Sequence, residues 1–214
     1  MVAQIVSAKH DQGYVLRIKG NGGILVEDIY KCLNDLEYAY NSAYVLKSIT
    51  QQAKELSKQY SNQQLPIPLR NLLWASWWPP NPEITAAFVP DEDRLKLHGV
   101  ELHSPGFWDF LGKLSPLTVI LDYLNLRHEQ RKDRVYREPA EAEKLRIENW
   151  TLELDAVEKQ LKLLIDMGAT PHDLSILRDQ LIKKSLKRLD VHQDQGLISN
   201  AEIVDPEAEK KKRK

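Results

Sequence analysis

The chain has 214 residues, of which 42% are hydrophobic and 29% charged, and this composition excludes a wholly disordered protein. The 30 Lys and Arg residues are balanced by 31 Asp and Glu residues, and the resulting net charge of −1 excludes a basic field over the whole surface. Cys32 is the single cysteine, which excludes an internal disulfide and fits a reducing compartment. The first residues lack a signal-peptide pattern, and no apolar run approaches the roughly 20 residues of a membrane span. We therefore expect a cytoplasmic protein.

The first elements are predicted to be a strand, a turn and a long helix. Residues Tyr14 to Lys19 alternate between apolar and polar, which predicts a strand, and the glycine-rich run 20–23 predicts a turn. A helix is expected from about Ile24 to beyond Ile49, because its apolar residues recur at helical spacing on one face. These residues are Leu25, Ile29, Leu33, Leu36, Tyr40 and Ala43.

Residues 60–90 form a segment of different character, rich in proline and tryptophan. Six prolines argue against a long helix here, so we expect an irregular segment, with a short strand at 84–89. Trp74, Trp77 and Trp78 suggest a partner-binding surface, since tryptophan is enriched at interaction hot spots. The alternative is that the three rings cap the protein's own core.

The middle of the chain is predicted to contain a strand, a short helix and a longer helix. The apolar alternation of 95–103 slips by one residue at Gly99, which predicts a β-bulge or tight bend. A short helix is expected over Phe107–Leu114, followed by a long one capped by Ser115 with Pro116 at its first position. The stretch 107–126 is the most apolar of the chain. We interpret it as a core segment, with a membrane-interface segment as the alternative.

A helical hairpin is predicted for the C-terminal part. Apolar residues at alternating steps of three and four make a heptad seam, which we expect to be buried within the chain or against a second copy. The seam comprises Ile147, Trp150, Leu154, Val157, Leu161 and Leu164. Thr170 and Pro171 predict the cap of a second amphipathic helix over 174–189, antiparallel to the first. Gly196 is expected to end it, and a last strand follows within 197–204.

Clusters of basic residues could contact polyanions. The tail 205–214 is predicted to be disordered, and it ends in five consecutive cations: Lys210, Lys211, Lys212, Arg213 and Lys214. These could bind nucleic acid or an anionic membrane, or could only keep the protein in solution. The basic stretches 127–137 and 183–188 are interpreted as solvated helix faces with ion pairs.

No catalytic residue, cofactor site or metal site is predicted. The glycine-rich turn lacks the spacing of a phosphate-binding loop, and its acidic neighbours Glu27 and Asp28 would repel phosphate. His98, Glu101 and His103 are close in sequence, but strand alternation places His98 on the opposite face from Glu101 and His103 unless the bulge at Gly99 realigns them, and no second cluster completes a metal site. Cys32 sits near the apolar helix face and is expected to be a buried, unreactive thiol. We therefore expect a protein that is not an enzyme.

Three runs in the second half of the chain carry a resemblance. They are SPGFWDFLG at 104–112, RHEQRKD at 127–133 and GLI at 196–198. Together they resemble a group of small, uncharacterised bacterial proteins, over about Leu95 to Ile198. That group has no established activity, so the resemblance implies no catalytic residue. Its form is similar to compact adaptor modules of bacterial signalling and defence systems, which is an analogy of fold only.

We therefore predict a mainly helical α+β protein. An α+β part is expected over 1–115, a long helix with the hairpin over 116–204, and a charged tail over 205–214. The expected function is that of a non-catalytic adaptor or regulatory protein that docks a protein partner through the tryptophan segment and the seam, with self-association also open. A peripheral membrane protein and a nucleic-acid-binding accessory protein are the alternatives.

Overall fold

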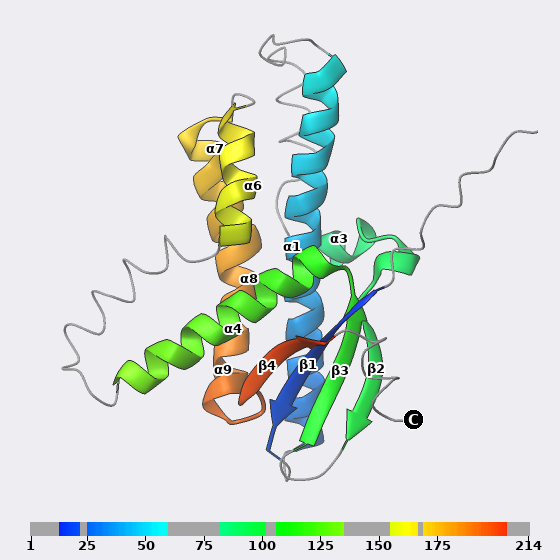
Figure 1. Ribbon diagram of the computed structural model, residues 1–214, viewed down its shortest axis with the longest axis vertical. Helices are drawn as coiled ribbons and strands as arrows, with labels where there is room; N and C mark the ends of the chain where they lie inside the picture. The colour runs from blue at the N-terminus through cyan, green and yellow to red at the C-terminus, as the bar shows by residue number, and fades with distance from the viewer. Residues whose placement is uncertain are drawn as a thin grey trace, which may run out of the picture.

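A small antiparallel sheet packs on one long helix, and further helices lie beside that helix (Figure 1). The computed structural model describes residues 13–21, 25–59, 82–101, 106–134, 155–166 and 169–204. Within them the protein is mainly helical with one four-stranded sheet, which confirms the predicted α+β class.

The sheet joins the two ends of the described chain. Its strands are β1 (Tyr14–Gly20), β2 (Lys96–Glu101), β3 (Gly106–Gly112) and β4 (Asn200–Val204), in the spatial order β2-β3-β1-β4. All neighbouring strands are antiparallel, and Leu16 of β1 lies between Phe110 of β3 and Ile203 of β4. The strands predicted near 14–19, 95–103 and 197–204 are therefore confirmed.

Helix α1 (Val26–Gln59) is the centre of the core. Its N-terminal half lies behind the sheet, and its C-terminal half extends beyond the sheet among the C-terminal helices (Figure 1). It is buried on more than one side, as expected of a central helix. The largest side chains that it buries completely are Leu36, Tyr40, Leu46 and Ile49.

Two predicted elements are wrong, namely the strand at 84–89 and the short helix at 107–114. Residues 84–89 are not a strand: α3 (Pro82–Ala87) is a short helix, with proline in its first turn and two alanines, which favour helix. The segment 107–114 is not a helix: residues 106–112 form β3. Aromatic residues fit a pleated surface well, and the glycines at 106 and 112 bound the strand.

Helix α4 (Leu114–Arg134) follows β3 almost directly. It begins at Leu114, so the predicted cap at Ser115 is wrong and Pro116 lies within the first turn. A short 3-10 turn, η1 (Asp91–Asp93), connects α3 to β2. The buried residues of α4 include Leu117, Ile120 and Leu124, which belong to the same core as α1.

The C-terminal helices run along α1. They are α6 (Asp155–Asp166), α7 (Pro171–Ile176), the π-helical segment η2 (Leu177–Lys183), α8 (Lys184–Lys187) and α9 (Leu189–Asp194). Helices α6 and α7 lie side by side (Figure 1), and Arg178 of η2 pairs with Glu158 of α6 at 3.0 Å. Thr170 caps α7 with Pro171 in its first turn, as the sequence predicted, and Asp173 completes a reciprocal cap that was not predicted. The π-helical segment was not predicted.

The residues just before β4 pack against the C-terminal end of β1. Gly196 has φ +80°, which favours glycine, and it ends α9 as predicted. A Cβ on Gly20 would lie 2.2 Å from the Leu197 carbonyl oxygen, so only glycine fits there. The backbone N–H of Ser199 donates to the Lys19 carbonyl at 2.7 Å. Residues of both predicted parts, 1–115 and 116–204, belong to one hydrophobic core.

Candidate functional site

Two of the sequence-predicted site residues are described, and both lie inside the protein. Val157 and Leu161 of α6 are buried in the core that α6 shares with α1, together with Leu164. They hold this fold together and offer no surface to a partner. The other seam residues (147, 150 and 154), the three tryptophans and the basic tail lie outside the described residues.

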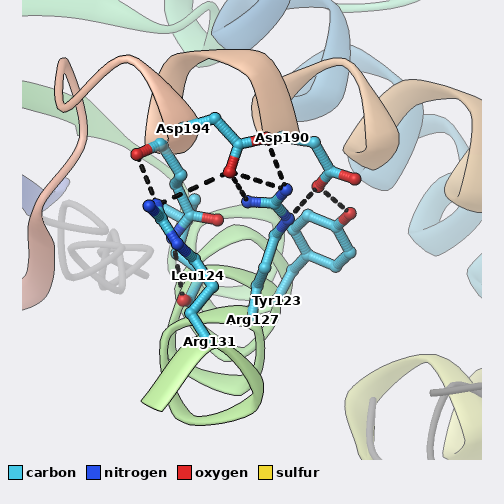
Figure 2. Close-up of polar contacts among 7 residues, drawn as sticks. Tyr123, Leu124, Arg127, Arg131, Asp190 and Asp194 are labelled. Carbon is cyan, nitrogen blue, oxygen red and sulfur yellow. Dashed lines mark hydrogen bonds and ion pairs between the residues drawn. The ribbon is translucent and has the colours of Figure 1, made fainter. Parts of the chain in front are cut away.

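A polar cluster joins α4 to α9 (Figure 2). Nε of Arg127 lies 2.7 Å from Asp190, and its Nη2 lies 3.0 Å from Asp194. Tyr123 also donates its hydroxyl hydrogen to Asp190. Arg131 donates to the carbonyl of Gln193 and lies 3.6 Å from Asp194. Two basic residues one helical turn apart on α4 therefore meet two acidic residues one turn apart on α9.

This α4–α9 cluster holds helices together and has no reactive arrangement. The amide of Gln193 donates to the Leu124 carbonyl at 3.0 Å, which fixes α9 directly against the α4 backbone. Burial raises the pKa of Asp190, and the Tyr123 hydrogen bond and the Arg127 charge oppose that shift only in part. Arg127 and Arg131, two basic residues of the 127–137 stretch, are thus paired with acidic residues inside the protein.

A second cluster surrounds Asp35 of α1. Asp35 accepts from Nε2 of His192 at 2.9 Å and lies 3.3 Å from Arg188, whose guanidinium stacks over the Tyr38 ring at 4.5 Å. Cys32, one turn earlier, is completely buried, and burial with the nearby Asp35 charge raises its pKa to about 12. A thiol that stays protonated cannot act as a nucleophile. This agrees with the predicted structural role of Cys32.

Two further polar clusters fix the sheet to its surroundings. The Tyr44 hydroxyl donates to Asp93 at 2.7 Å, and Lys113 lies 3.2 Å from the same carboxylate, so η1 is held against α1 and the start of α4. Arg17 and Asp109 form two parallel hydrogen bonds of 2.8 and 2.7 Å between β1 and β3. Each of these charges has its partner inside the fold, which is the pattern of a structural role.

No candidate metal site is present among the described residues. No group of three or more His, Cys, Asp or Glu side chains could hold a metal ion within the described ranges. His98 is exposed on β2, and His103 lies outside the described part of the chain. Of the helices described, none is long and apolar enough to cross a membrane. The buried side chains of α4 face the protein's own core, so they are not available to a membrane interface.

An exposed apolar surface lies at the beginning of α1, and sequence reasoning missed it. Leu25, Val26 and Tyr30 expose 69%, 82% and 70% of their surface, although the helix that follows is largely buried. Val26 and Tyr30 are one turn apart, so both side chains lie on one helix face. Leu25 was expected on the core face of the helix, but it precedes the first helical residue and points to solvent. We name Leu25, Val26 and Tyr30 the α1 apolar surface.

The comparisons with known proteins identify no relative. No protein-family model, no curated protein and no solved structure matches the chain.

Proposed function

We propose that this protein is a non-catalytic adaptor or regulatory protein, and that it binds a protein partner through the α1 apolar surface. The observation that carries the proposal is the concentration of three large apolar side chains, each more than two-thirds exposed, within six residues. Single exposed apolar residues are common on protein surfaces, but contiguous ones are typical of interaction sites.

The chemistry of this surface suits a protein partner better than a membrane. Glu27 and Asp28 lie in the first turn of α1, between Val26 and Tyr30 in the sequence, and acidic groups are repelled by anionic lipid. Lys31 pairs with Glu27 at 2.6 Å, which leaves the surface with an acidic margin. We therefore expect a partner with an apolar face and a basic margin. Tyr30 offers both a ring and a hydroxyl, which is why tyrosine is frequent at interfaces.

Neither alternative function is favoured by the described residues. A membrane-interface role would need the apolar side chains of 107–126, but several of them, including Phe110, Leu117 and Ile120, are buried in the core. A nucleic-acid role of the 127–137 stretch would need free basic side chains, and those of Arg127 and Arg131 are paired with Asp190 and Asp194.

The proposal is tested by matched substitutions in the full-length chain. Val26→Asp and Tyr30→Asp each place a charge on the α1 apolar surface, and an acidic residue in the first turns of a helix does not weaken it. Val191→Asp is the control, because Val191 is also a helical residue with about half of its side chain exposed. Tagged proteins are recovered from the native cells, and the co-purified proteins are quantified.

We expect Val26→Asp and Tyr30→Asp to lose the same co-purified protein, which Val191→Asp retains, with all three melting like the parent. A partner retained by both α1 variants would contradict the proposed docking surface. Identical losses in all three variants would contradict it as well, because they would not depend on this surface.

A further inference from the structure

Strand β2 forms one edge of the four-stranded sheet, and no strand among the described residues pairs with its outer side. It is the outermost strand in the order β2-β3-β1-β4, and none of its six residues is buried. Leu97 and Val100 expose 52% and 47% of their surface. Alternate N–H and C=O groups of an edge strand point away from the sheet, so such a strand is a template for pairing with another one.

A β-bulge in β2 decides which side chains share a face. Leu97 lies opposite Phe110 of β3, whereas Gly99 lies opposite the next residue along, Asp109, so His98 is an extra residue. Val100 then lies opposite Trp108, two residues from Phe110, and two residues along a strand return to the same face. Leu97 and Val100 are therefore on one face of the sheet, although they are three residues apart.

The same shift places Lys96 and Glu101 together on the other face. Lys96 lies opposite Leu111 and Glu101 lies opposite Phe107, and these two β3 residues are separated by an even number of steps. On one side of the bulge, Leu97 is followed outward by Lys96. On the other side, Val100 is followed outward by Glu101. The two apolar residues are similar, and the two charged residues have opposite sign.

This order is complementary to itself. If two copies of β2 pair antiparallel about a two-fold axis between His98 and Gly99, Leu97 faces Val100 of the second copy. Lys96 then faces Glu101 of the second copy, and both contacts occur twice because of the symmetry. Residues directly opposite in an antiparallel pair must lie on the same face. A regular strand would place Leu97 and Val100 on opposite faces and forbid this register, whereas the bulge permits it.

We infer that β2 is a self-association edge, through which two copies of the protein join their sheets into one. A bulge normally protects an edge strand, because an unrelated regular strand cannot keep register on both sides of it. A second copy has the same bulge at the same place, so its register agrees on both sides. The bulge and the charges therefore select a second copy over other strands. This inference uses other residues than the α1 apolar surface and stands apart from the proposed function.

Charge exchange tests the inference, because each single variant has a defined effect on the pairing. Lys96→Glu places two like-charged pairs in the dimer, and Glu101→Lys does the same with the opposite sign. Opposed like charges destabilise a strand pair, so each variant should raise the dimer Kd about tenfold or more. Sedimentation equilibrium of the full chain, up to the high micromolar range, measures these constants.

Two rescues make the test specific. In the double variant Lys96→Glu with Glu101→Lys, the attractive pairs are restored, and the Kd should return to within about threefold of the parent. An equimolar mixture of the two single variants should form heterodimers more tightly than either variant forms homodimers, since both cross-strand pairs are then attractive. Glu202→Lys on β4, at the other side of the sheet, is the control and should leave the Kd unchanged.

Three results would overturn the inference. The parent could remain monomeric throughout the concentration range. The single variants could dimerise as well as the parent, which would place the contact elsewhere. The mixture could show no preference for heterodimers, which would mean that Lys96 and Glu101 do not face each other across the axis. Circular dichroism of each variant checks that the fold is intact, which is expected because Lys96 and Glu101 are both exposed.

Discussion

The ion pair between Arg17 and Asp109 offers a sharp test of how the sheet is held together. The two residues face each other on β1 and β3, and their side chains expose only 13% and 7% of their surface. The guanidinium donates two hydrogen bonds to the carboxylate and lies over the Phe107 ring at 4.2 Å. Such a bidentate pair is strong, but removal of one partner leaves the other charge buried.

The expected magnitude follows from that burial. Asp109→Leu or Arg17→Met alone should lower the free energy of unfolding by about 3–5 kcal/mol. For a domain of this size, that corresponds to a drop in Tm of roughly 6–20 °C. The double variant Arg17→Met with Asp109→Leu should lose clearly less than the sum of the single losses, because neither charge is then stranded.

Urea unfolding of the four proteins at neutral pH measures this cycle. Glu202→Gln is a matched control on the neighbouring strand, since the Lys19–Glu202 pair is about half exposed and should contribute no more than about 1 kcal/mol. Losses from Arg17→Met and Asp109→Leu that simply add, or that are as small as the control, would refute the reasoning. The pair would then be effectively solvated.

Three further predictions concern the core, the thiol and the α4–α9 cluster. Leu161→Ala should lower the free energy of unfolding by about 2–5 kcal/mol, because Leu161 is fully buried between helices; a variant that unfolds like the parent in urea would exclude its place in the core. Cys32 should react with a thiol reagent only in the unfolded protein at neutral pH, because burial raises its pKa to about 12; fast labelling of the native protein would contradict this. The folded-state pKa of Asp190 is raised, so its contribution to stability is fully present below the pKa of the unfolded chain and is lost as the pH rises through the folded pKa. Relative to Asp190→Asn, the parent should therefore lose stability across that window, and a constant difference in unfolding free energy from pH 3 to 7 would show that the shift is absent.

Periodicity in the sequence predicted the parts of the fold in which one face is clearly apolar. The slip in alternation at Gly99 predicted the bulge between Leu97 and Gly99 in β2. The spacing from Val157 to Leu164 predicted the buried face of α6. The reciprocal Thr170–Asp173 contact needs only the residues of one helix turn, so local sequence is sufficient to predict this N-terminus.

Periodicity failed where several faces are buried or where long-range contacts decide. Residues 107–111 are partly buried on both faces of β3, so no alternation marked them as a strand. The pairing of Arg127 with Asp190 and Asp194 connects residues more than 60 positions apart, and the sequence did not indicate which charges would meet. One feature of the sequence could have indicated the α1 apolar surface. Val26 and Tyr30 lie beside the apolar stripe of the helix and make that stripe wider.

A photo-crosslinking amino acid at position 26 tests the central claim most directly. The full-length protein carries it there in its native cells, and a second version carries it at position 191 as the matched exposed helical site. The account predicts that irradiation joins position 26 to a distinct protein other than the chain itself, and that position 191 does not capture that protein. No adduct from position 26, or the same adducts from both positions, would contradict the proposal that the protein acts by docking a partner at the start of α1.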